Sequence, residues 1–382
     1  MKRYVVGLVG LLWLIGPVTV AAQTRYEKSY SDSKQLSVEG TLNDAGKRTG
    51  NWTWWYPNGQ MSQQGTYANG QKTGTWTLYY EDGSRMAEEC HGTGVSRSWF
   101  RNGDLKSEVN VENGKRTGLY RSWYDNGQVE EEITFVAGSR EGESRQWHRN
   151  GKLKFQGTYQ RDELQGKATW WLDDGKLDME GNLKDGAQEG AWRYYWRTNG
   201  QLGIEGNFSK DKETGQWTYY YETGERWRQG DYRNGKREGV WTTYYESGKK
   251  LHEGSYINGL EEGEWTSWYE DGAVDYTGSF SGGQKDGEWR GLYDDGSTRY
   301  VMHYSMDEKD GVEVRYYPNG QVELRQNYVG GVLEGKYERY NEAGGLVEKG
   351  QFVAGEKDGK WTWYDNGKLA YKAKFKAGQE VK

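Results

Sequence analysis

The sequence has 382 residues, with 51 Lys and Arg against 57 Asp and Glu, so its formal net charge is -6. The 57 glycines, 3 prolines and mean hydropathy of -1.11 exclude collagen, proline-rich linkers and a polytopic membrane protein. Disordered chains share this low hydropathy but are poor in aromatic residues, whereas this chain has 20 Trp and 31 Tyr. We therefore expect a folded chain that buries or stacks its rings.

Residues 1–22 have the order of parts found in a secretory signal peptide. Lys2 and Arg3 provide a positive start, residues 5–15 are apolar, and Pro17 precedes Val20-Ala21-Ala22. The apolar stretch is shorter than the roughly 20 residues that span a bilayer. We predict cleavage after Ala22 and an exported protein of the periplasm, cell envelope or medium, without a transmembrane segment in the mature chain. A retained N-terminal anchor is the alternative.

The charge and cysteine content limit the partners of the mature chain. Cleavage leaves 49 basic and 57 acidic side chains, a net charge of -8. Such a chain is a poor ligand for phosphates, which argues against binding to nucleic acid or to anionic lipid. Cys90 is the single cysteine, so no intramolecular disulfide can form, and we expect it to be a small buried packing residue.

A repeat of 24 residues fills the rest of the chain. A degenerate first repeat is expected over 23–49, and fourteen clearer repeats over 50–382. The spacing is 24 residues except for one interval of 20, after Gly74, and one of 25, after Gly190. Each clear repeat begins with a glycine in the pattern Gly-x-Trp/Tyr-x-x-aromatic-Tyr-x-Asn/Asp-Gly, and these leading glycines are Gly50, Gly74, Gly94, Gly118, Gly142, Gly166, Gly190, Gly215, Gly239, Gly263, Gly287, Gly311, Gly335 and Gly359.

Each repeat is expected to form one β-hairpin. In the first clear repeat, a run rich in Trp and Thr ends in Asn58-Gly59, a pair typical of a type I′ turn, and a second strand follows to Gly70. Charged runs such as 236–238 are expected in exposed connecting turns. The predicted fold is all-β: an elongated single-layer antiparallel sheet of stacked hairpins, with rings of neighbouring repeats in contact along rows.

The residues of this pattern resemble a known repeat family. The run from Glu253 to Gly272 is similar to a MORN repeat, of the variant kind found in bacterial proteins labelled YwqK-family antitoxins. The more familiar MORN pattern has Gly-x-Gly where this chain has Gly-x-Trp, as at Gly263-Glu264-Trp265. The resemblance implies a MORN-like hairpin array for protein or membrane contact, without chemistry of its own. Export separates this chain from cytosolic toxins, and its charge opposes phospholipid binding.

Two aromatic rows are candidates for a binding surface. The fifth and sixth residues after each leading glycine alternate between the faces of the sheet. These rings either pack on their neighbours in place of a core, or form a platform for sugars or an extended partner. The partner-binding candidates are the fifth residues of the middle repeats, namely Trp99, Trp123, Trp147, Trp171, Tyr195, Tyr220, Tyr244 and Trp268.

Catalytic and metal sites find little support in the sequence. His91, His148, His252 and His303 occupy different places in the repeat and form no metal-ligand spacing or triad. Carboxylates such as Asp307, Glu308 and Asp310 are expected to be solvated turn residues. We expect no enzyme activity, no metal and no cofactor.

The sequence therefore predicts an exported, non-enzymatic repeat scaffold that binds a protein or a cell-envelope partner, including an envelope glycan. Two alternatives stay open: an antitoxin-like or immunity-like protein that sequesters another protein, and a cell-wall carbohydrate-binding repeat protein. The irregular repeats after Gly74 and Gly287 are either recognition patches or products of drift.

Overall fold

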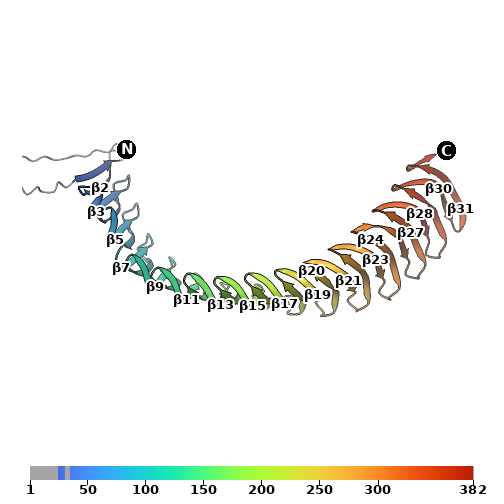
Figure 1. Ribbon diagram of the computed structural model, residues 1–382, viewed down its shortest axis with the longest axis horizontal. Helices are drawn as coiled ribbons and strands as arrows, with labels where there is room; N and C mark the ends of the chain where they lie inside the picture. The colour runs from blue at the N-terminus through green and yellow to red at the C-terminus, as the bar shows by residue number, and fades with distance from the viewer. Residues whose placement is uncertain (1–24, 31–34, 382) are drawn as a thin grey trace, which may run out of the picture. The chain divides into compact units, whose positions relative to one another are not determined.

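The computed structural model describes residues 25–30 and 35–381, and these form only strands, turns and bends (Figure 1). The predicted signal peptide lies outside the described residues. No helix in the described part of the chain has the length and apolar character to cross a membrane. Two compact units, 1–187 and 188–382, divide the chain at the start of β15, and each is described by itself below.

The first unit contains fourteen complete strands, each of six to nine residues. They are β1 (Arg25–Tyr30), β2 (Leu36–Leu42), β3 (Arg48–Trp55), β4 (Met61–Ala68), β5 (Gln71–Tyr79), β6 (Arg85–Cys90), β7 (Gly94–Trp99), β8 (Leu105–Glu112), β9 (Lys115–Trp123), β10 (Val129–Val136), β11 (Ser139–Trp147), β12 (Leu153–Gln160), β13 (Glu163–Trp171) and β14 (Leu177–Lys184).

The second unit continues the same pattern to the end of the chain. Its strands are β15 (Ala187–Tyr195), β16 (Leu202–Ser209), β17 (Lys212–Tyr220), β18 (Arg226–Arg233), β19 (Lys236–Tyr244), β20 (Lys250–Ile257), β21 (Leu260–Trp268), β22 (Val274–Ser281), β23 (Gln284–Leu292), β24 (Thr298–Ser305), β25 (Glu308–Lys309), β26 (Gly311–Tyr316), β27 (Val322–Val329), β28 (Val332–Tyr340), β29 (Leu346–Val353), β30 (Glu356–Asp365), β31 (Lys368–Lys376) and β32 (Gln379–Val381).

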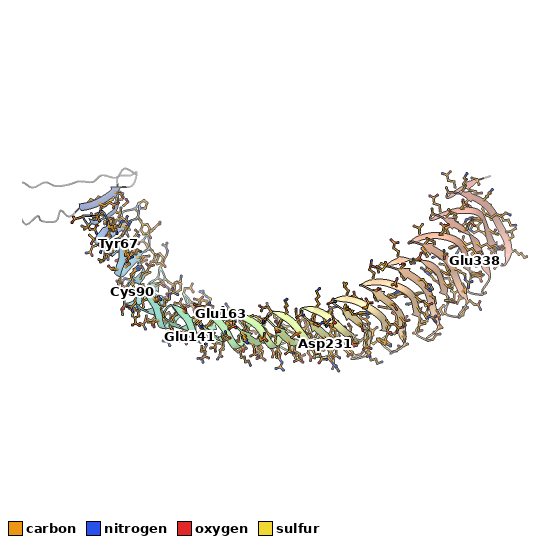
Figure 2. The ribbon with its side chains drawn as sticks, in the orientation of Figure 1. Tyr67, Cys90, Glu141, Glu163, Asp231 and Glu338 are labelled. Atoms are coloured by element: carbon orange, nitrogen blue, oxygen red, sulfur yellow. The ribbon has the colours of Figure 1, made fainter. Side chains whose placement is uncertain are left out.

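Within each unit the strands pair antiparallel in chain order, as in β3–β4 and β4–β5 or β17–β18 and β18–β19. The short β25 and the following β26 both pair with β24, because Asp310 interrupts the strand between them. Side chains stand on both faces of the ribbon, and no second layer of secondary structure covers either face in the described residues (Figure 2). The predicted all-β, single-layer antiparallel sheet of hairpin repeats is confirmed.

Two kinds of turn alternate along the sheet, and the predicted type I′ position is wrong for most repeats. At Asn58-Gly59, the Gly59 amide donates to the Tyr56 carbonyl at 2.9 Å, and only the glycine has a positive φ, of 87°. This is a type I turn followed by a left-handed glycine, which we call a bulged turn. The type I′ pair lies at the other end of the hairpin, where Asn69 and Gly70 have φ of 50° and 87°. We call these two-residue connections tight turns.

The leading glycine forms a bulge that tips the next tryptophan onto the preceding strand. The β2–β3 ladder passes from Gly40–Trp52 directly to Thr41–Thr49, so Gly50 and Asn51 are extra residues of β3. Gly50 has a φ of 63°, which favours glycine because it has no Cβ. The Trp52 ring then lies over Gly40, where an added Cβ would come within 2.1 Å of it. The repeat motif Gly-x-Trp therefore encodes a bulge and a buried ring.

These tryptophans form the core of the single-layer sheet. We call the face that carries them the core face, and the opposite face the open face. Trp52, Trp76 and Trp361 are fully buried, and the aromatic residues of the second strands pack edge-on against them. Tyr232, for example, lies 5.1 Å from Trp241 with the rings at 90°. Edge-to-face packing is favoured by the charge distribution of aromatic rings.

Cations near the starts of the first strands cover the outer side of this core. Arg48 lies 4.4 Å from the Trp52 ring centroid, Lys285 lies 4.4 Å from Trp289, and Arg237 lies 4.7 Å from Trp241. Such cation–π contacts contribute about 0.5–1 kcal/mol each where they are exposed to solvent. The charged run 236–238 was predicted as a connecting turn, but it forms the start of β19, and the turn before it is Asn234-Gly235. The stem of Arg237 covers the Trp241 ring.

Several repeats without a core tryptophan have a larger residue in place of the facing glycine. Ser144 is fully buried opposite Ile133, and Tyr120 packs against the cluster that contains Val109 and Ile133. In the repeat that begins at Gly311 the tryptophan position holds Glu313, which is 1% exposed. In these repeats the volume lost on one strand is restored on its neighbour, as close packing requires. Ala168 differs, because Gly157 is kept opposite it and the buried Phe155 ring lies beside that glycine.

The buried Glu313 carboxylate is held by three polar side chains. Its oxygens accept from Arg315 Nε at 2.6 Å, Gln326 Nε2 at 2.8 Å and Lys309 Nζ at 3.2 Å. Burial opposes ionisation, but these hydrogen bonds and charges outweigh it and lower the pKa of Glu313. Met302 occupies the facing glycine position in the preceding strand and is also buried. The repeat that begins at Gly311 therefore has a compact ionic cluster in place of the core tryptophan, whereas the repeat that begins at Gly287 keeps the buried Trp289.

The short repeat after Gly74 contains the cysteine. Cys90 is 9% exposed at the end of β6, and its backbone amide donates to the Ser96 hydroxyl at 2.9 Å. The expectation that Cys90 is a buried packing residue is confirmed.

Candidate functional site: the open face and its ring row

The eight partner-binding candidates lie on the open face at the bulged-turn end of their strands. Each is the last residue of a first strand, as Trp123 is of β9 and Trp147 of β11. All eight are half-buried. Trp99, Trp123, Trp147 and Trp171 form a row in the first unit, and Tyr195, Tyr220, Tyr244 and Trp268 form a row in the second. Together we call these eight residues the ring row.

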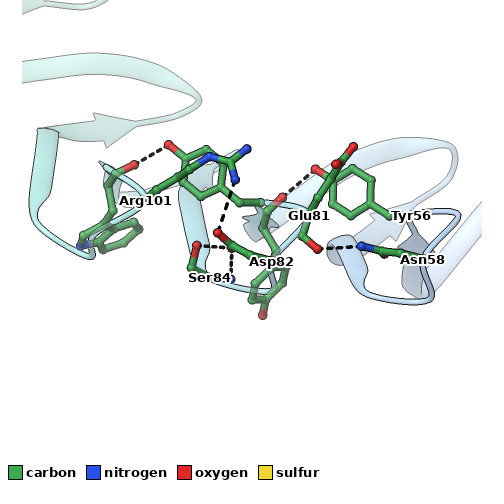
Figure 3. A network of polar contacts seen from close by, with 9 residues as sticks. Tyr56, Asn58, Glu81, Asp82, Ser84 and Arg101 are labelled. Atoms are coloured by element: carbon green, nitrogen blue, oxygen red, sulfur yellow. Dashed lines mark hydrogen bonds and ion pairs between the residues drawn. The ribbon is translucent and has the colours of Figure 1, made fainter.

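The sixth residues after the leading glycines have a different task from the one predicted. The Tyr56 hydroxyl donates to the Tyr79 carbonyl at 2.8 Å, and the Tyr80 hydroxyl donates to the Trp99 carbonyl at 2.9 Å (Figure 3). Tyr124, Tyr221 and other members repeat this bond to the next ring-row residue. The sixth position therefore ties each bulged turn to the following one and presents no free platform.

Turn side chains strengthen this connection. Asn58 Nδ2 donates to the Glu81 carbonyl at 2.8 Å, and the Arg101 guanidinium lies 3.4 Å from the Asp82 carboxylate (Figure 3). Asp82 also accepts from the hydroxyl and the amide of Ser84, and these bonds lower the pKa of Asp82. The side chain of Asn58 or Asp82 thus closes its own turn, and Asn58 also donates a hydrogen bond to the next turn.

The rings of the ring row do not stack on one another as the sequence had suggested. Among the described residues, Trp99, Trp123, Trp147 and Trp171 make no ring–ring contact. The ring contacts are concentrated on the core face, at the second residue after each leading glycine, which sequence reasoning missed as a row. The sequence did contain a sign of this core row: a tryptophan such as Trp241 occurs with a glycine, Gly230, on the preceding strand, whereas the small Ser144 occurs with the larger Ile133.

A row of charges runs beside the ring row on the open face of the first unit. Arg97 Nε lies 3.5 Å from a Glu108 carboxylate oxygen, and Arg121 Nε lies 2.6 Å from Glu132. Arginine and glutamate alternate along it because the third residue after each leading glycine faces the second strand of its own repeat. Exposed pairs of this kind add little stability, about 0–1 kcal/mol each. Their effect is to give the open face closely spaced donors and acceptors.

One ring-row member lies at a hollow. Trp171 borders a hollow of about 440 Å³ on the open face of β11, β12 and β13, together with Glu143, Gln156, Lys167 and Thr169. Gln156 Nε2 donates to Glu143 Oε1 at 2.6 Å, which fixes both side chains at one wall. The hollow thus combines one aromatic ring with fixed polar groups and a cation.

Nine segments of the chain match the family model described as MORN repeat variant, at residues 48–69, 93–113, 116–137, 140–161, 213–234, 237–258, 261–281, 309–329 and 357–377. They cover about half of the chain and occur in both units. The chain belongs to the MORN repeat variant family. This confirms the resemblance at the level of the family, and the geometry above shows what its Gly-x-Trp pattern encodes.

Solved structures give weaker likenesses to this MORN repeat variant protein. A crystal structure of TcdB2-TccC3-Cdc42 is 10% identical, with a TM-score of 0.15, and the match covers 92% of this chain and 24% of that one. The Photorhabdus luminescens Tc holotoxin pore is 12% identical, with a TM-score of 0.16, and the match covers 93% of this chain and 22% of that one. A eukaryotic initiation factor structure is 12% identical, with a TM-score of 0.19, 92% of this chain and 96% of that one.

This chain spans about a quarter of the toxin-complex chains, and TM-scores this low support no inference. Among curated proteins, no sequence match was found.

The histidines of this MORN repeat variant protein lie apart from one another. His91 Nε2 is 3.6 Å from Glu89, and His303 Nε2 is 3.8 Å from Glu288. Burial lowers the pKa of His252. No group of three or more metal-ligating side chains occurs within residues 25–30 and 35–381. The candidate site is the ring row with the hollow at Trp171.

Proposed function

We propose that this chain is an exported, non-enzymatic scaffold whose open face binds a protein or cell-envelope partner through the ring row. The family supports a repeat scaffold. The observation that carries the binding proposal is the hollow at Trp171, where a half-buried ring lies beside Glu143, Gln156 and Lys167. Binding sites combine apolar or aromatic surface with a few polar groups that fix orientation. Export is supported by the sequence of residues 1–22.

The aromatic rings of the two faces differ in burial, and this difference supports the proposal. Trp171 and its row are half-buried at the strand ends, whereas Trp192 and Trp217 are 3% and 4% exposed on the core face. Loss of a buried tryptophan costs about 3–5 kcal/mol. We therefore expect ring-row substitutions to change binding, and core-face substitutions to change stability.

The test is a triple variant, Trp123→Ala, Trp147→Ala and Trp171→Ala. Binding to purified peptidoglycan and to soluble glycans is measured by pull-down, and protein partners are identified by crosslinking in intact cells. We expect loss of the captured partner with an unchanged unfolding transition, while the matched core variant Trp192→Ala loses stability. A triple variant that retains its partner, or that unfolds as Trp192→Ala does, would show that the row is structural. Fractionation tests export: an uncleaved cytosolic product contradicts it and favours the antitoxin-like alternative.

A further inference from the structure

The single 25-residue repeat contains an apolar slot that is bordered by two ring-row residues, Tyr195 and Tyr220. Its insertion lengthens the bulged turn, which closes through Trp196 N to the Gln201 carbonyl at 2.8 Å. Trp196 replaces the usual tyrosine, and its Nε1 still donates to the next carbonyl, that of Tyr220, at 3.2 Å. The indole lies close to Gly203, where an added Cβ would come within 3.1 Å of Nε1.

The slot lies where one side chain is missing and the next is large. Gly203 in β16 and Trp227 in β18 are equivalent positions of successive repeats, at which other repeats carry residues such as Ser62 and Lys154. A volume of about 190 Å³ opens there, and Trp227 is 38% exposed. Its walls come from Tyr194, Tyr195, Trp196, Gly203, Ile204, Tyr219, Tyr220 and Trp227.

The Arg228 side chain lies against two of these walls. The Arg228 guanidinium carbon is 4.2 Å from the Tyr219 ring centroid and 4.5 Å from that of Trp227. Its Nε is buried and has no hydrogen-bond partner among the described residues. A buried donor without a partner costs free energy, and a carboxylate is the group that pairs best with a planar guanidinium.

We propose that this slot binds a protein partner that presents one apolar side chain next to a carboxylate. Ordinary small-molecule pockets measure about 300–1,000 Å³, so a slot of about 190 Å³ has room for a single side chain. A sugar ring needs several hydrogen-bonding side chains around it, and these walls offer almost none. The apolar group enters between Trp196 and Trp227, and Arg228 pairs with the carboxylate.

The carboxylate can belong to a chain terminus or to an acidic side chain, and two probes distinguish these sources. N-acetyl-phenylalanine carries a terminal carboxylate, and N-acetyl-phenylalanyl-aspartate amide carries a side-chain carboxylate. N-acetyl-phenylalaninamide is the neutral control. Binding to the full chain is measured by ligand-observed NMR and calorimetry. We expect one or both acidic probes to bind about tenfold more tightly than the amide, the factor of a charged hydrogen bond.

Two variants test the site itself. Gly203→Leu fills the slot and should abolish binding of the acidic probes, whereas Lys154→Leu, at the equivalent position of another repeat, should leave it unchanged. Arg228→Gln should make acid and amide bind equally. The proposal is overturned if no acidic probe binds more tightly than the amide, if Gly203→Leu binds as the parent chain does, or if N-acetylglucosamine binds this slot in place of the acids. The ring-row triple variant should retain this binding, which separates the slot from the proposed function.

Discussion

The interlock between the core tryptophans and the facing glycines can be tested by adding one methyl group. At Gly230, an added Cβ would lie 2.3 Å from Trp241 Cδ2 and 2.5 Å from Cε2. The ring cannot easily yield, because it is 4% exposed and its Nε1 donates to the Asp231 carbonyl at 3.0 Å. Gly230→Ala must therefore displace the indole or separate the strands.

The expected cost follows from two contributions. Overpacking a dense core costs about 1–3 kcal/mol, and the indole hydrogen bond contributes about 1 kcal/mol. We expect local destabilisation of about 2–4 kcal/mol, although alanine is intrinsically easier to order than glycine. Gly92→Ala is the matched control, because no atom lies within 4 Å of a Cβ added there.

The assay must report locally, because long repeat arrays do not unfold in one step. Native-state hydrogen exchange of peptides from β18 and β19 measures the local opening equilibrium. The expected cost corresponds to a loss of protection of about 30-fold to 1,000-fold. The paired swap Gly230→Ile with Trp241→Ser, which copies the natural Ile133 and Ser144 pair, should recover part of it. Unchanged protection in Gly230→Ala would refute the interlock.

Three further outcomes concern the polar contacts. Tyr245→Phe removes the hydroxyl bond to the Trp268 carbonyl, at 2.9 Å, and should cost about 0.5–1.5 kcal/mol by hydrogen exchange of that turn. Burial raises the pKa of the Tyr245 hydroxyl in the folded protein. The stability that this hydroxyl contributes is therefore complete below its unfolded-state pKa and lost as pH rises through its folded-state pKa. We expect the free energy of unfolding to depend less on alkaline pH in Tyr245→Phe than in the parent chain. The pKa of Glu313 is lowered in the folded protein. The stability that its carboxylate contributes is therefore present above the unfolded-state pKa of this group and lost as pH falls through its folded-state pKa. Glu313→Gln should cost about 3 kcal/mol at neutral pH and remove this acid dependence, as measured by unfolding at pH 3 to 7.

Most of the fold could be predicted from the sequence, because the period of the glycines fixes the strand length and the pairing of neighbours. The turn types could not, since Asn-Gly is compatible with both a bulged turn and a tight turn; hydrogen bonds such as Gly59 N to the Tyr56 carbonyl decide between them. The core row was missed because a tryptophan on a strand gives no sign of which face it buries. Its burial depends on the bulge at the leading glycine.

The candidate site could be predicted only in part. The ring row was identified by position, and the structure places it on one face, but the hollow at Trp171 depends on side chains from three strands. The slot near Gly203 was missed although the one-residue insertion was visible. A missing side chain becomes a cavity only when the next repeat carries a large one, here Trp227.

The interlock also determines where the chain can be cut or lengthened. Phe280 lies 5.1 Å from Trp289, across the tight turn, but 5.7 Å from Trp265, across the bulged turn, and this difference recurs along the chain. The smallest natural module is therefore the pair of strands joined by a tight turn, offset by half a period from the sequence motif. Truncations and duplications made within bulged turns keep each indole with its glycine. Gene segments that begin and end in bulged turns would therefore encode folded proteins of different lengths.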